Sequence, residues 1–456
     1  MQMKTFLSSL LFLITLFANS QNWQGVGGGM NFWVEKLYAD SVSDVLYATG
    51  AFSTAGGTNV NRIAKWNDTA WSALATGISS NAKDFCWYNS EFYVGGGFLY
   101  VQGGTVWSPG LAKWDGVKWD SLPIQPFPTG NGAILDLMVY NNELYVSGIF
   151  DTIAGIPANS IAKWNGSAWS TINFPYGQQN PAIITSMAMY NGDLYIGGNI
   201  DDTLYGEMYR YDGANWYAVG NGIFGAMAQV NKLIVYKNEL YVAGSFSQYE
   251  YSGNPGNTIA KWNGSTWSDV AGGTSYICLG CAQIFDMTIF NNNLYVVGTF
   301  DSIGGIYASR IAYWDSTKWC SLGTTFNYGL SSVAVYNNEL YIACGKLIDT
   351  DTMNYIAQWT GGSFTDTCGN TSAVNETNSS SQISIYPNPT TGIFTITSTE
   401  KISSIRITNI IGQEIYHLTI QPFNHSTIDL STHPKGIYFL KVISEGNIYT
   451  QKIIIQ

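Results

Sequence analysis

A unit of four strand-like runs recurs along the chain and constrains its fold more than any other feature. One copy starts at Ile134 with Ile-Leu-Asp-Leu-Met-Val-Tyr-Asn-Asn-Glu-Leu-Tyr-Val-Ser-Gly and continues at Ile161 with Ile-Ala-Lys-Trp-Asn-Gly-Ser-Ala-Trp. Apolar, alternating runs are separated by Asn-Asn-Glu and Asn-Gly, which tolerate the positive φ of tight hairpin turns. The unit therefore predicts four antiparallel strands.

Three markers of this unit each occur seven times. The second strand has a Leu-Tyr or Phe-Tyr pair, and these pairs are 46 to 54 residues apart, at Leu46, Phe92, Leu144, Leu194, Leu240, Leu294 and Leu340. The third strand has an aromatic residue at Trp66, Trp114, Trp164, Tyr211, Trp262, Trp314 and Trp359. The fourth strand has one at Trp71, Trp119, Trp169, Trp216, Trp267, Trp319 and Phe364. A four-stranded unit of this period predicts an all-β fold, a seven-bladed β-propeller of four-stranded antiparallel blades, over residues 21–369.

A strand before the first complete unit bears on how the ring closes. The run Trp23-Gln-Gly-Val-Gly-Gly-Gly-Met30 is similar to the fourth strand that begins at Trp216. We expect it to pair with the last blade, which would remove two open sheet edges. The run Phe364–Cys368 is a competing candidate, and the last blade could use both.

The blades resemble those of known propeller families. Val94-Gly-Gly and Ile196-Gly-Gly after the second strand, with the downstream aromatic pairs, resemble kelch-type propellers, although the two aromatics lie closer together than in kelch repeats. The Ala-Lys-Trp-Asn/Asp-Gly segments are closer to bacterial surface propellers and the related fungal polarity-marker family. The resemblance covers about residues 22–368 and implies a fold rather than an activity.

The first 20 residues are typical of a secretory signal peptide. Lys4 precedes an apolar core at residues 6–17, which is too short to span a bilayer. Small residues before the expected cleavage point place the cut between Ser20 and Gln21. No later stretch reaches 18 apolar residues, so we expect no transmembrane segment in the mature chain.

The composition changes after the last repeat. Residues 370–382 are rich in Ser, Thr and Asn and indicate a linker, and residues 383–456 indicate a small β-sandwich of roughly seven short strands. This tail resembles a type A C-terminal sorting domain of the type IX secretion system. The residues that support the resemblance include Tyr386, Pro387, Asn388, Pro389, Gly392, Gly412, Gly436 and Lys452.

The resemblance of the tail implies a partner and a location. It implies that an outer-membrane translocon recognises the tail and removes it. The protein would then be secreted or held at the cell surface after passing through the periplasm and outer membrane. An ordinary accessory β-sandwich is the alternative.

Charge and histidine content exclude several functions. The net charge of −11 argues against a nucleic-acid partner, because phosphate binding needs clustered Lys and Arg. All three histidines, His417, His425 and His433, lie in the tail, where we expect surface positions. The propeller therefore lacks the residue needed for Ser–His or Cys–His nucleophiles and for galactose-oxidase-like copper sites. We expect no metal and no cofactor, and we favour a protein that is not an enzyme.

Three carboxylates share one position of the repeat. Asp84, Asp136 and Asp286 lie four residues before the end of each first strand, and Ser186, Lys232 and Ser332 occupy the equivalent places elsewhere. They should be innermost, near the channel mouth. They could bind a cation or a sugar, or act as the paired carboxylates of a glycosidase. We favour the interpretation that they hydrogen-bond backbone between blades.

Loop lengths indicate which face is functional. The connections between strands two and three, and between blades, are long and lie on one face. On these loops Trp107, Tyr249 and Tyr251 could stack on sugar rings, although local packing is the commoner role of such aromatics. Cys278 and Cys281 are spaced as a redox motif, a half zinc site or a loop disulfide; a disulfide or free thiols fit an exported chain best.

These observations predict an exported propeller that binds a ligand, a glycan or a surface protein, without catalysis. A secreted carbohydrate-active enzyme that uses propeller carboxylates is the alternative. A purely structural adhesin is the third possibility.

Overall fold

The computed structural model describes residues 23–361 and 383–455, with gaps at 42, 123–131, 176–181, 201–205, 221, 225–227, 249–250, 276–281, 349–350, 389, 410–413 and 445–446. The predicted signal peptide, with Ser20 and Gln21, lies outside the described residues. The chain divides into two compact units, residues 1–373 and 374–456, which are treated separately.

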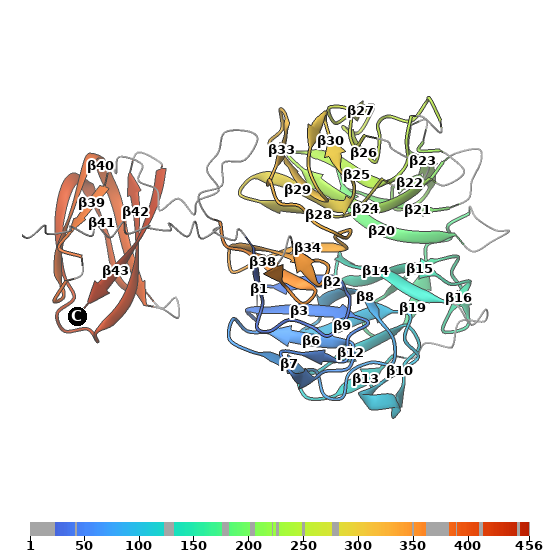
Figure 1. Cartoon of the computed structure of the whole chain (residues 1–456), viewed down its shortest axis with the longest axis horizontal. Coiled ribbons are helices and arrows are strands. Elements are labelled where there is room, and N and C mark those ends of the chain that lie inside the picture. The colour runs from blue at the N-terminus through green and yellow to red at the C-terminus, as the bar shows by residue number, and fades with distance from the viewer. Residues whose placement is uncertain are drawn as a thin grey trace, which may run out of the picture. The chain divides into compact units, whose positions relative to one another are not determined.

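The first unit is a β-propeller whose described residues form seven four-stranded antiparallel sheets, which confirms the predicted blades (Figure 1). The innermost strands are β2 (Val34–Asp40), β8 (Ala82–Tyr88), β14 (Ala133–Tyr140), β20 (Ile183–Tyr190), β24 (Gln229–Tyr236), β28 (Gln283–Phe290) and β34 (Ser332–Tyr336). The second strands are β3 (Val45–Gly50), β9 (Glu91–Gly96), β15 (Glu143–Ile149), β21 (Asp193–Asn199), β25 (Glu239–Ser245), β29 (Asn293–Thr299) and β35 (Glu339–Ala343).

The outer half of each blade contains the repeated aromatics. The third strands are β6 (Ile63–Trp66), β12 (Leu111–Trp114), β18 (Ile161–Trp164), β22 (Met208–Tyr211), β26 (Ile259–Trp262), β32 (Ile311–Trp314) and β38 (Ile356–Trp359). The outermost strands are β7 (Trp71–Ala73), β13 (Trp119–Ser121), β19 (Trp169–Thr171), β23 (Trp216–Ala218), β27 (Trp267–Asp269), β33 (Trp319–Ser321) and β1 (Trp23–Gly25).

Several loops between the second and third strands form small hairpins. These pair β4 (Thr54–Ala55) with β5 (Thr58–Asn59), β10 (Tyr100–Val101) with β11 (Val106–Trp107), β16 (Thr152–Ile153) with β17 (Ile156–Pro157), β30 (Ser302–Ile303) with β31 (Ile306–Tyr307), and β36 (Leu347–Ile348) with β37 (Asp351–Thr352). A single 3₁₀ turn, η1 (Gln102–Gly104), joins β10 to β11.

The N-terminal strand closes the ring, as predicted. β1 pairs antiparallel with β38, so that Trp23 lies opposite Trp359 in the register that Trp71 and Trp66 have in blade one. Trp23 thus provides the outermost-strand aromatic of the last blade, a position that the sequence marker series gave to Phe364. Phe364 itself lies outside the described part of the chain. A Cβ atom on Gly27 would lie 2.2 Å from Cζ3 of Trp66, so only glycine lets the chain pass from blade seven onto blade one there.

Neighbouring blades are joined by hydrogen bonds from the repeated aromatics to backbone carbonyls. Indole Nε1 atoms of the outermost strands donate to the preceding blade over 2.9–3.1 Å, in the pairs Trp71–Val26, Trp119–Leu74, Trp216–Ile172, Trp267–Val219 and Trp319–Val270. Tyrosine hydroxyls at the ends of inner strands donate to the next blade, in the pairs Tyr88–Asn142, Tyr190–Asn238, Tyr236–Asn292 and Tyr336–Asp44. The fourth-strand tryptophans and inner-strand tyrosines in these pairs are therefore scaffold residues.

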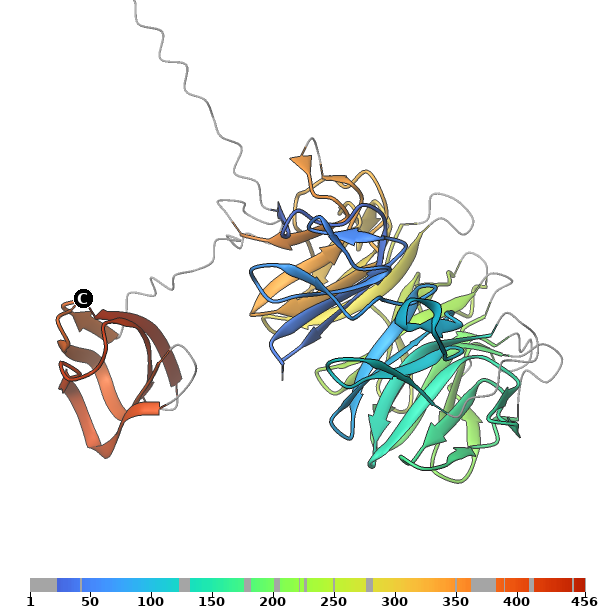
Figure 2. The ribbon, with the colours of Figure 1, turned by 90° about the horizontal axis from the view of Figure 1, so that it is seen from below.

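The inner strands form a continuous ring around the propeller axis. Each contacts the inner strand of the next blade, and β34 contacts β2. The first blade (blue) and the seventh (orange) lie side by side in both ribbon views (Figure 2). Within each blade, strands one and three run in one direction and strands two and four in the other, so strands one and three start at the same face.

The second unit is a small β-sandwich of five strands rather than the predicted seven or so. Its strands are β39 (Ile383–Tyr386), β40 (Ile393–Asn409), β41 (Glu414–Asp429), β42 (Gly436–Ser444) and β43 (Asn447–Ile455). Two predicted strands, at 393–398 and 402–409, are halves of β40. Pairing of β40 with β41 shifts register between Thr397 and Ile402, which bends β40 without ending it. Isoleucines from both halves, including Ile396 and Ile405, are buried in one core.

Candidate functional site at the channel mouth

A β-bulge near the start of the inner strands creates the candidate site. In blades one to six the pairing of strands one and two skips one residue, for example Leu135 between Ile134 and Asp136. A bulge leaves its extra residue out of the ladder and redirects its side chain. Here that residue lines a cavity on the propeller axis, at the face where the inner strands begin.

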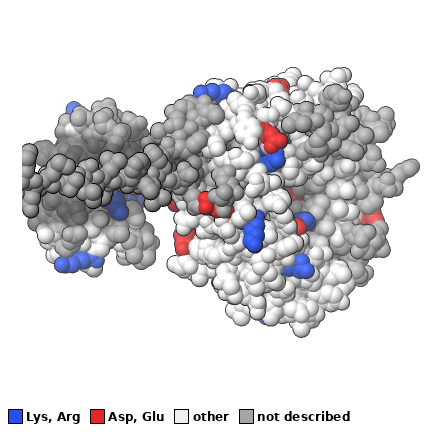
Figure 3. All heavy atoms as spheres, in the orientation of Figure 1, with Lys and Arg blue, Asp and Glu red and all other residues white. Residues whose placement is uncertain are grey.

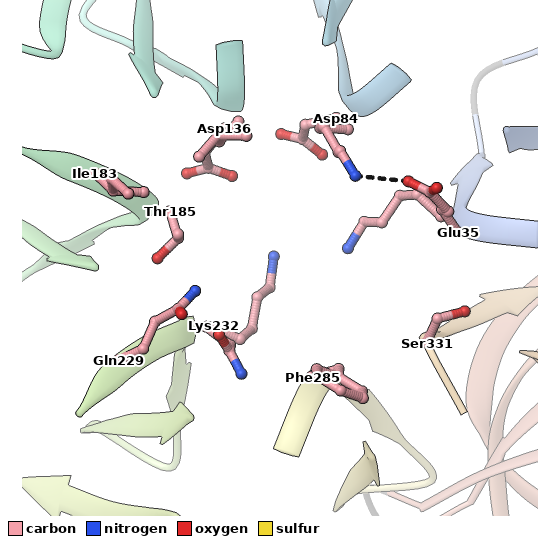
Figure 4. A pocket seen from close by; sticks show the side chains of 13 residues that line it. Glu35, Asp84, Asp136, Ile183, Thr185, Gln229, Lys232, Phe285 and Ser331 are labelled. Atoms are coloured by element: carbon pink, nitrogen blue, oxygen red, sulfur yellow. Dashed lines mark hydrogen bonds and ion pairs between the residues drawn. The ribbon is translucent and has the colours of Figure 1, made fainter. Parts of the chain in front are cut away.

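The cavity has a volume of about 400 Å³, and its wall combines charged and polar side chains with apolar ones. All seven blades contribute the equivalent residue, which we call the bulge ring: Glu35, Lys83, Leu135, Thr185, Asn231, Phe285 and Ser331. Deeper positions add Lys36, Asp84, Asp136 and Lys232, and earlier positions add Ile183 and Gln229. Figure 4 shows the side chains of Asp136, Thr185, Gln229 and Lys232 directed into this space.

Several bulge-ring side chains are held by the next blade. Ser331 Oγ donates to the carbonyl of Val34 at 2.8 Å, Asn231 Nδ2 donates to that of Ile284 at 2.9 Å, and Thr185 Oγ1 donates to that of Val230. Because hydroxyl and amide oxygens keep acceptor capacity after such bonds, fixed acceptors remain available at the wall.

The aspartates singled out from the sequence lie one residue deeper than the bulge ring. They are buried, and each accepts a backbone amide of the next blade, as the favoured interpretation expected. The bonds are Leu137 N to Asp84 at 2.8 Å, Met187 N to Asp136 at 2.6 Å and Val333 N to Asp286 at 3.2 Å. Ser186 and Ser332 accept from Leu233 and Leu37 in the same way.

Two lysines interrupt this series, because an ammonium group cannot accept a hydrogen bond. Lys36 occupies the equivalent position in blade one, which was not among the equivalent positions named from the sequence. Its Nζ lies 3.0 Å from Asp286 Oδ2. Burial favours a higher pKa for Asp286, but Lys36, Lys232 and the hydroxyl of Ser332 together hold that pKa below its ordinary value. Burial opposes the charge of Lys232, yet the carboxylates of Asp286, Asp136 and Asp84 raise its pKa.

The pKa of Asp136 is far above that of an ordinary aspartate. Burial, followed by the charge of Asp84 and a hydrogen bond to it, raises the pKa of Asp136 to about 8. Asp136 therefore keeps its proton near neutral pH. With Asp136 protonated, Glu35, Asp84 and Asp286 balance Lys36, Lys83 and Lys232, so the mouth is close to neutral.

The proton on Asp136 makes stability depend on pH. The folded state holds a proton on Asp136 that the unfolded chain releases near pH 4, so the free energy of unfolding should fall as pH rises through about 8. Between pH 6 and 9 the loss should be roughly 2 kcal/mol. Asp136→Asn, which can still accept from Met187 and donate to Asp84, should remove this slope in urea unfolding.

A matched control for this titration is Asp115→Asn. Backbone amides of Lys118 and Val117 lower the pKa of Asp115, so it stays ionised over this range. Its slope should equal that of the unaltered chain. An unaltered chain whose stability is flat from pH 6 to 9 would show that Asp136 does not hold this proton.

The aromatic candidates on the loops lie elsewhere. Trp107 is 42% exposed and contacts Tyr100 edge-on at 4.9 Å, and Tyr251 is 46% exposed and packs at 5.0 Å from Phe224. Neither is among the residues that line the cavity, and Tyr249 lies outside the described residues.

Metal and thiol chemistry have little support among the described residues. No group of three or more His, Cys, Asp or Glu there is placed to hold a metal ion. Cys86 and Cys344 are free and buried, and burial raises the pKa of both thiols. Cys320 is disulfide-bonded, and Cys278 and Cys281 lie outside the described part of the chain.

In the tail, the predicted sorting motif joins the start of the sandwich to its last strand. Asn388 Nδ2 donates to the carbonyl of Lys452 at 2.8 Å, and Ile454 N donates to Asn388 Oδ1 at 3.0 Å. Gly392 has φ +116°, and a Cβ there would lie 2.5 Å from Cα of Ser431, so glycine is required.

The other motif residues vary in exposure. Tyr386, Pro387, Gly436 and Lys452 are exposed, whereas Pro389 and Gly412 lie outside the described residues. His417 and His425 are exposed, and His433 is half-buried.

Comparison with known families agrees with this assignment of the tail. Residues 384–456 match the family described as "Secretion system C-terminal sorting domain". The protein is thus a β-propeller with a type IX sorting domain, and it is secreted or displayed at the cell surface. No helix in the described part of the chain is long and apolar enough to cross a membrane.

The chain is also similar to two solved structures. No curated protein matches the chain. It is 10% identical to the extracellular domain of a putative hybrid two-component system from Bacteroides thetaiotaomicron, covering 95% of this chain and 57% of that one, with a TM-score of 0.43. A structural genomics protein of unknown function from the same species is 13% identical, with coverages of 70% and 90% and a TM-score of 0.31. The chain thus spans little over half the length of the first of these.

Proposed function

We propose that the exported propeller is a non-catalytic binding protein that holds a neutral, hydroxyl-rich ligand, a glycan, at the channel mouth. The tail delivers it by engaging the translocon of the type IX system. The observation that supports this function is the bulge ring, in which seven equivalent inward positions have seven different side chains. The aspartates and serines one residue deeper bond backbone amides of the next blade instead.

The chemistry of the wall favours a glycan over a charged ligand. Opposite charges are interspersed, as in the ion pair of 2.6 Å between Lys83 and Glu35, so neither sign dominates. Figure 3 likewise shows few charged side chains on this face of the propeller, with acidic and basic groups intermixed. Fixed hydroxyl, amide and carboxyl groups around a compact cavity suit the many hydroxyls of a sugar.

An enzyme that uses the propeller carboxylates is the alternative. The carboxyls of a glycosidase are separated by roughly 5 Å or more, to admit the sugar or a water. Asp84 and Asp136 are instead buried, and each accepts a hydrogen bond from a backbone amide of the next blade. This geometry favours binding without turnover.

A glycan array probed with the full chain tests the proposal. Gln229→Met keeps the length of a cavity side chain but removes its amide, so array binding should weaken about tenfold if one or two hydrogen bonds are lost. Gln24→Met, at an exposed position of β1, is the matched control and should bind normally.

Each outcome separates the candidate functions. Binding without release of product supports a binding protein. Hydrolysis of a bound glycan that Asp136→Asn abolishes would instead establish the enzyme. Binding to no glycan on the array would contradict the proposal and favour a structural adhesin.

A further inference from the structure

Four aromatic side chains meet at the surface where blade seven joins blade one. Phe32, Trp33, Tyr328 and Tyr355, which we call the aromatic platform, have ring centroids 5.4–6.5 Å from their neighbours. Phe32, Trp33 and Tyr328 are 47%, 37% and 53% exposed, whereas the repeated aromatics of the blades are mostly buried. Core packing therefore does not account for these three exposed rings, whereas Tyr355 also packs against the core.

The platform lies on the face where the cavity opens. Phe32 and Trp33 immediately precede β2, Tyr355 immediately precedes β38, and Tyr328 lies shortly before β34. Strands one and three of a blade start at the same face, so all four side chains belong to the mouth side of the propeller.

The position of Trp33 in the repeat places the platform beside the wall of the cavity. In the strand register Val34 pairs with Gly50 as Ile184 pairs with Gly198 and Val230 with Gly244. Trp33 is thus the blade-one equivalent of Ile183 and Gln229, which line the cavity. Glu35 and Ser331, two and three residues beyond Trp33 and Tyr328, line it as well.

The platform residues are held in place by the backbone. The carbonyl of Trp33 accepts from Ala51 N at 2.9 Å, and that of Tyr355 accepts from Cys344 N at 3.1 Å. Tyr328 packs against Gly345, where a Cβ would lie 2.5 Å from its Cδ2 atom. The rings of Trp33 and Tyr328 meet at 82°, so they form two walls of a corner instead of covering each other's faces.

We propose that the aromatic platform binds the apolar ring faces of a neutral oligosaccharide whose end enters the cavity. This inference rests on the proposed function and extends it from a single sugar to a chain of several. A sugar ring has an apolar C–H face and a hydroxyl rim, which matches exposed aromatic faces beside fixed hydrogen-bonding groups. A hydrophobic peptide would match the aromatic faces but leave the polar groups of the mouth unpaired.

The test uses the full chain, an array of neutral oligosaccharides, a peptide array, and calorimetric titration with the tightest oligosaccharide. Trp33→Ala and Tyr328→Ala should each weaken oligosaccharide binding about tenfold, as loss of a central aromatic contact does. Both side chains are at the surface, so melting temperatures should change little. Trp107→Ala and Tyr100→Ala remove an equally exposed aromatic pair in blade two and should bind normally.

Three results would overturn the inference. Normal binding by Trp33→Ala and Tyr328→Ala, with binding lost in Gln229→Met, would leave the cavity as the site without the platform. Lost binding in the Trp107→Ala control would move the aromatic contact to blade two. Loss of peptide rather than oligosaccharide binding in Trp33→Ala would identify a protein ligand instead.

Discussion

A chain that ends at Gln382 should accumulate in the periplasm instead of reaching the medium or the cell surface. Residues 384–456 form the sorting domain, with its own hydrophobic core around Ile396, Ile405 and Leu440. Because the propeller core is built separately, the truncated chain should still fold. The expected effect is near-complete loss of export, measured by immunoblotting of medium, surface, periplasmic and cytoplasmic fractions.

The reciprocal experiment removes the propeller instead. A fluorescent protein with residues 1–20 at its N-terminus and residues 370–456 at its C-terminus should be exported. The full chain with Trp107→Ala is the matched control, since that exposed propeller residue should not affect export. Undiminished export of the chain ending at Gln382 would refute the sorting role of this tail.

The propeller could be predicted from the sequence because its scaffold contacts repeat. Most of the fourth-strand tryptophans, such as Trp71, bond the preceding blade, and the inner-strand tyrosines, such as Tyr88, bond the next. Most junctions therefore use the same residue types at the same spacing. Closure was predictable for the same reason: Trp23 has the sequence surroundings of a fourth strand and occupies that register.

The site could not be predicted in the same way. Asp84 and Asp136 were predicted as candidate site residues because aspartate recurs at their position of the repeat. Aspartate recurs there because its carboxylate accepts a hydrogen bond from a backbone amide of the next blade. The bulge ring lies one residue earlier, and a bulge interrupts the two-residue alternation on which strand patterns depend. The sequence signal for the bulge ring was variation at one position of the repeat. Glu35, Leu135 and Asn231 are unlike one another there, whereas the residue types at the neighbouring positions recur from blade to blade.

The aromatic platform depends on closure itself. Trp33 and Tyr328 are nearly 300 residues apart in the sequence, and neither belongs to a repeated position that marks the blade. They meet at 5.4 Å only because β34 packs beside β2 when the ring is complete. Local patterns contain no information about such a pair.

Loss of ring closure should therefore lower the free energy of unfolding, and replacing Trp23 tests this. Its side chain is 1% exposed, contacts Trp359 at 4.9 Å and Phe326 at 5.8 Å, and donates from Nε1 to Thr324 Oγ1 at 3.1 Å. Trp23→Ala removes these contacts and leaves a cavity, for which a loss of about 3–5 kcal/mol is expected. Chemical unfolding followed by circular dichroism measures it.

Comparison with Trp107→Ala distinguishes the effect of losing ring closure from the effect of removing any tryptophan side chain. Trp107 is 42% exposed, so its removal should change the free energy of unfolding by no more than about 0.5 kcal/mol. Because Trp33 and Tyr328 are brought together by the junction that Trp23 closes, Trp23→Ala should also weaken oligosaccharide binding, although Trp23 itself is buried. Equal stability of the Trp23→Ala and Trp107→Ala chains would mean that β1 does not hold the ring closed.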